Sequence, residues 1–273
     1  MSDRVTLSIE AGVADVRLNR PDKRNALDPA MFAGIVEMGE RLKIEPGVRA
    51  VVLSGEGASF CAGLDFSSFR AMGDSPRPDE GDERRERRPD DGLDGRITHQ
   101  GQQCAWVWQE VPVPVIAAVH GHALGGGIQI MLGADIRIVH PDAKLSVREV
   151  HWGLIPDMTG TLTLSRLVGV DVAKELTFTA KMISGTEASE VGLVTHLSDD
   201  PRADAMSLAA EIATRSPEAV RGAKELFNRL ANADAAEQFA AERQVIGSLF
   251  STPNQIEAIK AGMDGRAAEF TDV

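Results

Sequence analysis

The sequence is poor in aromatic residues and cysteine, and it has no long apolar run. It has no tyrosine and only 4% aromatic residues, so it offers few rings on which bases could stack. The formal net charge of −12 argues against a phosphate backbone as partner. Two cysteines are too few for a metal-ligand cluster of their own, and we expect both to be reduced thiols. No apolar run approaches the roughly 20 residues that span a bilayer, and the first residues do not form a secretory signal. We therefore expect a cytoplasmic protein that binds no metal, no membrane and no nucleic acid.

Strand-like and helix-like segments alternate along most of the chain. Alternating apolar residues predict a β-hairpin over residues 5–18, and Asp28 followed by Pro29 predicts the start of a helix. Further strands are expected at 48–53, 114–119, 136–139, 145–147 and 193–197. Further helices are expected at 97–110, 126–132, 162–167, 172–179, 203–214, 217–230, 233–250 and 254–263. Alternation followed by a run of helices indicates an α/β fold with a C-terminal helical part.

One segment breaks this alternation. Residues 73–92 have no apolar side chain except proline, and charges of both signs crowd together there. Such a segment cannot bury enough surface to offset the entropy that it loses on ordering. We expect a mobile loop over about residues 73–96. It would be either a lid over a ligand site or a solvated insertion without a role, and the sequence leaves both open.

Two glycine-containing turns form the candidate functional site. Residues 60–65 read FCAGLD and residues 121–129 read GHALGGGIQ, and each turn follows an apolar strand-like run and leads into a helix-like one. Such turns leave backbone N–H groups unpaired at a helix start, with positive partial charge pointing outwards. Two of these turns brought together would bind one developing oxyanion.

Five motifs, in order, resemble the crotonase (enoyl-CoA hydratase/isomerase) superfamily. They are NRPDKRNAL at 19–27, FCAGLD at 60–65, VHGHALGGG at 119–127, ADIR at 134–137 and GLIP at 153–156. The resemblance implies an α/β fold in which ββα units form a ClpP-like spiral, followed by a helical region that builds a homotrimer or a dimer of trimers. We accordingly expect a crotonase core domain over residues 1–198 and a C-terminal helical region over residues 199–273.

The resemblance also implies catalytic roles for four residues. The backbone N–H groups of Leu64 and Gly126 would form an oxyanion hole around the thioester oxygen of an acyl-CoA substrate. Glu149 would be the principal base and Asp157 the second proton carrier, as in the dienoyl-CoA isomerase branch. Hydratases of this superfamily carry another glutamate where this chain has Gln129, which cannot titrate.

Coenzyme A is part of the expected substrate, and no separate cofactor is expected. Lys23 and Arg24 would face its phosphates, the backbone around Ala62 its adenine and pantetheine, and Phe250 the coenzyme A of a neighbouring subunit. The full set of candidate substrate-binding residues is Lys23, Arg24, Ala26, Ala62, Gly63, Asp65, Gly125, Gln129 and Phe250.

We therefore expect a hydratase/isomerase-type enzyme that acts on unsaturated acyl-CoA thioesters, with double-bond isomerisation favoured over hydration. One alternative keeps the oxyanion hole but performs hydration, thioester hydrolysis, decarboxylation or carbon–carbon cleavage. Another alternative is a non-catalytic acyl-CoA-binding protein that has lost the acid at position 129.

The sequence leaves the roles of individual residues open. Asp157 could instead cap the helix that starts near Thr159, and Glu149 could instead pair with Arg148. Gln129 could orient the substrate or a water, or be an ordinary helix residue. His151 and the two histidines at 120 and 122 are expected to be structural, as are Trp106 and Trp108.

Overall fold

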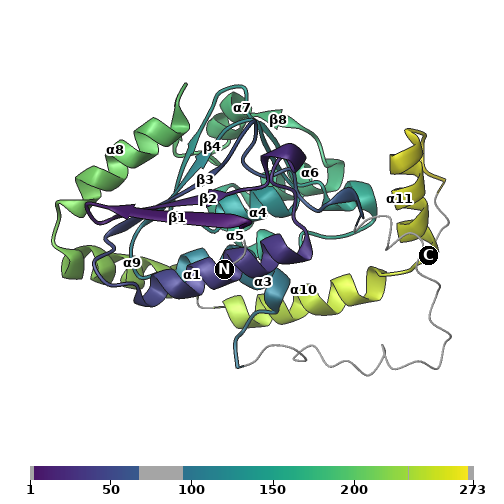
Figure 1. Cartoon of the computed structure of the whole chain (residues 1–273). Coiled ribbons are helices and arrows are strands. Elements are labelled where there is room, and N and C mark those ends of the chain that lie inside the picture. Colours follow the sequence, from purple (N-terminus) through teal and green to yellow (C-terminus); the bar gives the residue numbers. More distant parts are fainter. Residues whose placement is uncertain (1–2, 68–94, 233, 270–273) are drawn as a thin grey trace.

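The computed structural model describes residues 3–67, 95–232 and 234–269, so most of the expected loop at 73–96 lies outside the described residues. A six-stranded sheet runs through the molecule (Figure 1). Its strands, in spatial order, are β1 (Val5–Glu10), β2 (Val13–Leu18), β3 (Ala50–Gly55), β4 (Val115–Val119), β6 (Ile136–Val139) and β9 (His196–Leu197). The β1–β2 pair is antiparallel, which confirms the predicted hairpin, and the other pairs are parallel.

The central strands β3 and β4 are apolar because both of their faces are covered. Every residue of β4 is buried, and so is every residue of β3 except Gly55. A continuous apolar run, without alternation, is typical of strands inside a parallel sheet. β3 begins two residues later than predicted, because the N–H of Arg49 donates to the carbonyl of Gly12 in the hairpin turn.

A small second sheet lies beside the glycine turns. It contains β5 (His122–Leu124), β7 (Lys144–Ser146) and β8 (Ile183–Ser184). The sequence predicted β7 but not β5, β8 or the helix α7 (Gly185–Glu190) that follows, and it extended β9 too far towards its N-terminus. Strands of two or three residues are too short to show a pattern of alternation.

Most of the helices lie where the sequence predicts them. They are α1 (Pro29–Ile44), α3 (Gln100–Glu110), α4 (Gly126–Leu132), α5 (Gly160–Leu167), α6 (Val170–Thr179), α8 (Pro201–Ala213), α9 (Pro217–Ala231), α10 (Ala235–Leu249) and α11 (Pro253–Asp264), with short 3₁₀ turns η1 (Pro21–Lys23) and η3 (Glu149–Trp152). The side chain of Asp28 caps α1 by accepting from the N–H of Met31, as predicted. Within the described residues, no helix is long and apolar enough to cross a membrane.

The start of α3 differs from the prediction. His99 caps this helix by accepting from the N–H of Gln102, whose own side chain accepts in return from the N–H of His99. This reciprocal pair of hydrogen bonds fixes the first helical residue at Gln100, three residues after the predicted start. Histidine is not among the residues that usually signal a helix start, so the sequence pattern gave the boundary incorrectly.

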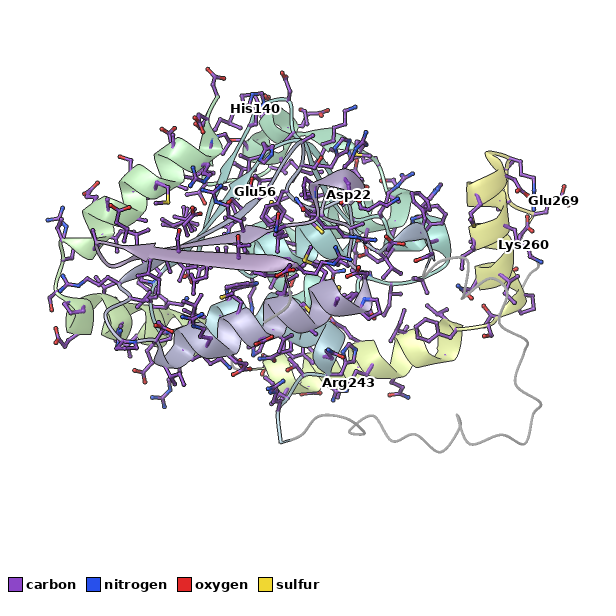
Figure 2. All side chains as sticks on the ribbon, in the orientation of Figure 1. Asp22, Glu56, His140, Arg243, Lys260 and Glu269 are labelled. Atoms are coloured by element: carbon purple, nitrogen blue, oxygen red, sulfur yellow. The ribbon has the colours of Figure 1, made fainter. Side chains whose placement is uncertain are left out.

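The C-terminal helices attach to the core in different places. α8 covers one face of the large sheet through a stripe of buried alanines (Ala205, Ala209 and Ala213), while α1, α3 and α4 lie on the other face. α10 runs below α3 and α11 stands at the far edge, packed on η3, with Lys260 and Glu269 on this side of the molecule (Figure 2). The α/β class is confirmed, whereas the division into regions 1–198 and 199–273 stays a prediction.

Candidate active site

The two glycine turns lie side by side. The N–H of Cys61 donates to the carbonyl of His122 at 2.8 Å, and the N–H of Leu124 donates to the carbonyl of Cys61 at 3.1 Å. Two residues on, Gly63 has a φ of +86°, and a Cβ atom there would lie 2.6 Å from the carbonyl oxygen of Leu124. Only glycine fits this close approach between two backbones.

The residues Leu64 and Gly126 both lie next to Leu27. Leu27 donates its N–H to Gly63 and accepts from Asp65, so the N–H of Leu64 between them points away from Leu27. Gly126 opens α4, where an N–H has no acceptor inside the helix, and a Cβ atom there would lie 2.7 Å from the side chain of Leu27. Within the described part of the chain, neither N–H donates to a protein acceptor.

Glu149 lies next to the second turn. It is the first residue of η3, 8% exposed, and a Cβ atom on Gly125 would lie 3.4 Å from its Oε1. Oε1 accepts from the side-chain NH₂ of Gln129 at 2.6 Å, whereas Oε2 is buried and has no partner among the described residues. Burial, together with the negative charge of Asp157, raises the pKa of Glu149 to about 8.

Gln129 is a fixed partner of Glu149. It is fully buried, and its Oε1 accepts from the N–H of Met158 at 2.9 Å and from the N–H of Gly160 at 3.0 Å. Backbone N–H groups can only donate, so the amide has one orientation and its NH₂ group must face Glu149. The hydrogen bonds of Gln129 thus join Glu149 to the loop that carries Met158 and Gly160, and its predicted role towards substrate stays a prediction.

Asp157 lies in the loop between η3 and α5. Burial and the negative charge of Glu242 raise its pKa to about 7. It does not cap α5, because the N-cap position belongs to Thr159, which has a φ of +70° and makes no capping hydrogen bond with its side chain. Arg148, the alternative partner of Glu149, donates instead to the carbonyl of Ala180 at 3.1 Å.

The raised pKa of Glu149 predicts a loss of stability in alkaline solution. Because the folded pKa of about 8 lies above the ordinary 4.5, the folded state holds the proton more tightly than the unfolded state. The contribution is fully present below about pH 4.5 and is lost as the pH rises through about 8.

Urea unfolding at pH 6 and pH 9 tests this prediction. The wild-type free energy of unfolding should fall between these two pH values by on the order of several kcal/mol. Glu149→Gln should fall clearly less, whatever its absolute stability. An equal fall in both proteins would contradict the raised pKa.

The model of the enoyl-CoA hydratase/isomerase family matches residues 8–273. The chain belongs to this family. Its fold is therefore the crotonase fold, as the resemblance implied, and it is an enzyme of the hydratase/isomerase type.

Relatives within the enoyl-CoA hydratase/isomerase family carry different activities in their names. A short-chain-enoyl-CoA hydratase of Clostridium acetobutylicum is 34% identical, over 98% of this chain and 97% of its own. A mitochondrial Delta(3,5)-Delta(2,4)-dienoyl-CoA isomerase of Mus musculus is 32% identical, over 95% of this chain and 79% of its own. The crystal structure of an enoyl-CoA hydratase/isomerase from Mycobacterium paratuberculosis superposes with a TM-score of 0.82 at 26% identity, covering 95% of this chain and 98% of that one.

The family's candidate coenzyme A residues fall into two groups in the structure. Lys23 and Arg24 are exposed at the end of η1, and the carbonyl of Arg24 accepts from the N–H of Ala62, so these segments adjoin. Ala26 is buried at the same place, whereas Phe250 is 41% exposed and follows the last residue of α10. Their roles in binding stay predictions.

Asp65 is already engaged within the protein. Its carboxylate accepts from the N–H and hydroxyl of Ser67 and pairs with Arg20 at 2.7 Å. These hydrogen bonds to Ser67, and then the contact with Arg20, lower the pKa of Asp65 to about 2. The side chain therefore fixes the turn that carries Leu64, and its predicted contact with substrate stays a prediction.

The tryptophans and His151, which were expected to be structural, pack within the protein. Trp106 and Trp108 are buried, and Trp106 meets Phe239 edge-on with ring centroids 4.7 Å apart. His151 is exposed and packs edge-on against Trp152. Within the residues that the structure describes, no three histidine, cysteine, aspartate or glutamate side chains are placed to hold a metal ion.

Sequence reasoning missed Glu242, the carboxylate beside Asp157. The signal was present, because Ala235, Phe239, Glu242 and Ile246 recur at helical spacing and form the buried face of α10. A charged residue within such an apolar stripe is expected to have a specific set of partners.

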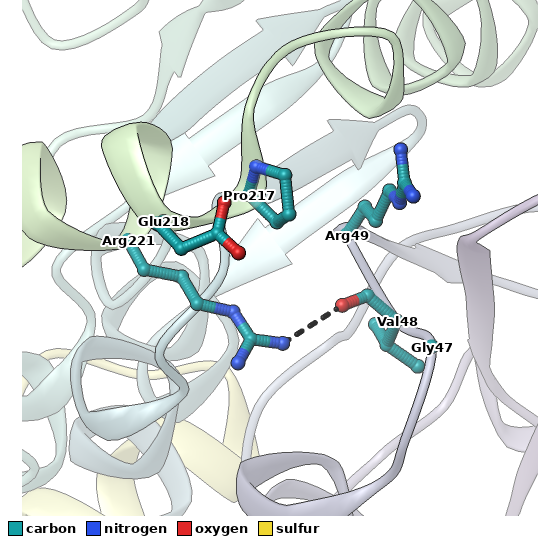
Figure 3. Close-up of a pocket in the computed structure, with 6 residues that line it drawn as sticks. All are labelled: Gly47, Val48, Arg49, Pro217, Glu218 and Arg221. Atoms are coloured by element: carbon teal, nitrogen blue, oxygen red, sulfur yellow. Dashed lines mark hydrogen bonds between the residues drawn. The ribbon is translucent and has the colours of Figure 1, made fainter.

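A surface pocket lies away from the glycine turns, at the start of β3. Residues 47–49 and the start of α9 line it, and Arg221 donates to the carbonyl of Val48 at 3.2 Å (Figure 3). This is the end at which β3 begins, whereas the glycine turns follow the ends of β3 and β4. In open parallel sheets, ligands bind beyond the carboxyl ends of the strands, so we do not assign the reaction to this pocket.

Proposed function

We propose that this enzyme moves a double bond within an unsaturated acyl-CoA thioester, with Glu149 as base and Asp157 as second proton carrier. The observation that carries the proposal is the state of Gln129. Two backbone N–H groups occupy its oxygen and its NH₂ group donates to Glu149, so it can neither carry a proton nor accept a hydrogen bond from water. Of the two glutamates that the resemblance implies for hydration, this chain therefore has only Glu149.

The first half of the reaction removes a proton beside the thioester carbonyl. The Oε2 atom of Glu149, which has no partner within the described residues, takes this proton, and the electron pair left behind moves onto the carbonyl oxygen. The N–H groups of Leu64 and Gly126 are proposed to stabilise that negative charge. The second of them opens α4, so the helix dipole adds to the stabilisation.

The second half returns a proton to the far end of the conjugated system. Asp157 supplies it, and the electrons flow back from the oxygen to form the shifted double bond. Glu149 is then protonated and Asp157 ionised, so one proton must pass from Glu149 to Asp157 through solvent before the next cycle. The net composition of the substrate is unchanged.

Substrate binding and assembly complete the proposal. Lys23 and Arg24 are exposed cations, and they are proposed to bind the phosphates of coenzyme A. A trimer is proposed from the family resemblance, and α9 leaves the large apolar side chains of Leu226 and Phe227 67% and 73% exposed, as an interface would need.

Direct assay of the products tests the proposal. The purified enzyme is incubated with 3-enoyl-, 3,5-dienoyl- and 2-enoyl-CoA, and the products are separated by chromatography with mass detection. We expect shifted double bonds of unchanged mass from the first two substrates. Water addition to the 2-enoyl substrate, without isomerisation of the others, would contradict the proposal.

The paired carboxyls also predict the pH dependence of the rate. Glu149 and Asp157 interact, so they titrate as a pair with apparent pKa values of about 8 and about 7. The reaction needs one proton on the pair, and that form is most populated between the two values. We expect a bell-shaped profile of kcat/KM with its maximum between pH 7 and 8. A rate that rises steadily to pH 10 would contradict it.

A further inference from the structure

Glu242 is a buried carboxylate that the proposed reaction does not yet use. It lies on α10 and is 2% exposed. It accepts three hydrogen bonds from uncharged donors: the side-chain NH₂ of Gln102 at 3.1 Å, the N–H of Thr159 at 3.1 Å and the hydroxyl of Thr161. Three donors on an acceptor-only group favour its ionised form and oppose the rise in the pKa of Glu242 that burial causes.

The loop that carries Asp157 is held between Glu242 and Gln129. The N–H groups of Met158 and Gly160 donate to Gln129, and the N–H of Thr159 between them donates to Glu242. Thr159 has a φ of +70°, a costly conformation for a β-branched residue. Such strain persists only where surrounding contacts fix the backbone, and here the two buried side chains supply those contacts.

The same arrangement affects the two reacting carboxyls in opposite ways. Gln129 donates to Glu149 and so favours its ionised form, while the negative charge of Glu242 raises the pKa of Asp157. For the single proton of the pair Glu149–Asp157, both effects favour Asp157 and oppose the burial that raises the pKa of Glu149 to about 8.

We propose that Glu242 is a positioning residue: it holds the Asp157 loop through the hydrogen bond from Thr159 and shifts the shared proton towards Asp157, so that a larger share of the enzyme enters the reaction with Glu149 as the base. This inference rests on the proposed function of these two carboxyls. Asp157 interacts electrostatically with Glu242, and Gln102, which donates to Glu242, also accepts from Arg243 and donates its backbone N–H to His99.

Glu242→Gln tests this inference with little change in shape. The amide oxygen can still accept from Gln102 and Thr159, and the hydroxyl of Thr161 can turn to accept from the new NH₂ group. The matched control is Glu237→Gln, which removes an exposed carboxylate from the same helix.

The main measurement needs no substrate. The aspartate carboxyl groups are labelled with ¹³C, the signal of Asp157 is assigned by its loss in Asp157→Asn, and its chemical shift is followed against pH by NMR. We expect the titration midpoint of Asp157 to fall by about one pH unit or more in Glu242→Gln and to stay unchanged in Glu237→Gln. An unchanged midpoint in folded Glu242→Gln would overturn the inference.

A second variant covers the case in which Glu242→Gln does not fold. Thr161→Val removes one donor to Glu242 and keeps its charge, so Glu242 becomes harder to ionise. The midpoint of Asp157 should then fall in the same direction by a smaller amount, and no fall would again overturn the inference.

Turnover of unsaturated acyl-CoA by the wild type separates the two proposals. If the wild type turns over no substrate while the midpoint still falls as expected, the proposed function fails and the placement of the proton stands. If the wild type turns over substrate, we expect kcat of Glu242→Gln to fall about tenfold and its pH profile to move to lower pH. KM should change little. A merely structural role would lower the melting temperature without moving the profile.

Discussion

Replacing Glu149 by glutamine is expected to lower the isomerisation rate about 10²–10⁴-fold, which is the usual contribution of a general base. The substitution keeps the shape of the side chain, and its oxygen can still accept from Gln129. Steady-state kinetics with a 3-enoyl-CoA substrate measures the loss. Exchange of the α-proton with deuterated solvent should fall with it, because both require the same proton transfer.

Binding of a saturated acyl-CoA provides the control. Glu149→Gln should bind it with a Kd close to that of the wild type, and Glu190→Gln, at an exposed position on α7, should retain full activity. A Glu149→Gln enzyme that keeps its rate would assign the base to another residue. A loss of binding that equals the loss of rate would give Glu149 a structural role.

Gly63→Ala is expected to disrupt both stability and activity. The new Cβ atom would lie 2.6 Å from the carbonyl oxygen of Leu124, and that turn is fixed by its hydrogen bonds to Cys61. Relief of the clash must move the backbone on which the N–H of Leu64 is carried. Loss of one oxyanion-hole donor typically costs about 10²–10³ in rate, and we expect a rate loss of this size.

Gly47→Ala separates the clash from simple backbone strain. Gly47 has a φ of +79°, close to the +86° of Gly63, but a Cβ atom there meets nothing within 4 Å. In urea unfolding, Gly47→Ala should lose about 1–3 kcal/mol and keep its activity. Gly63→Ala should lose clearly more stability. Equal losses in the two variants, with equal activity, would mean that the turns are not held as the geometry indicates.

The sequence predicted helix starts correctly where residues at the start itself determine them. Asp28 and Pro29 marked the start of α1, and the glycines at 125–127 marked the start of α4. Short elements such as β5 and β8 carry too few residues for a pattern, and they form because the turns beside them bring their strands together. Propensity alone could not show this, since the pairing is set by tertiary contacts.

The sequence supplied candidate residues for the site but not the hydrogen bonds that connect them. The sequence shows that Gln129 cannot titrate, but not that its oxygen is bound by Met158 and Gly160. It gives no reason to join Thr159 to Glu242, because the two are 83 positions apart. Hydrogen bonds between residues so far apart in the sequence depend on how whole helices pack, and this packing cannot be read from a single sequence.

The hydrogen bond from Thr159 to Glu242 has a consequence for the order in which the chain folds while the ribosome is still making it. Chains are made from the N-terminus, and the strands of the large sheet, the last of which ends at Leu197, emerge before α10 does. A nascent chain can thus assemble its sheet while the acid-bearing loop still lacks its anchor. A product truncated before α10 would lack Glu242, and with it the hydrogen bond that holds Thr159.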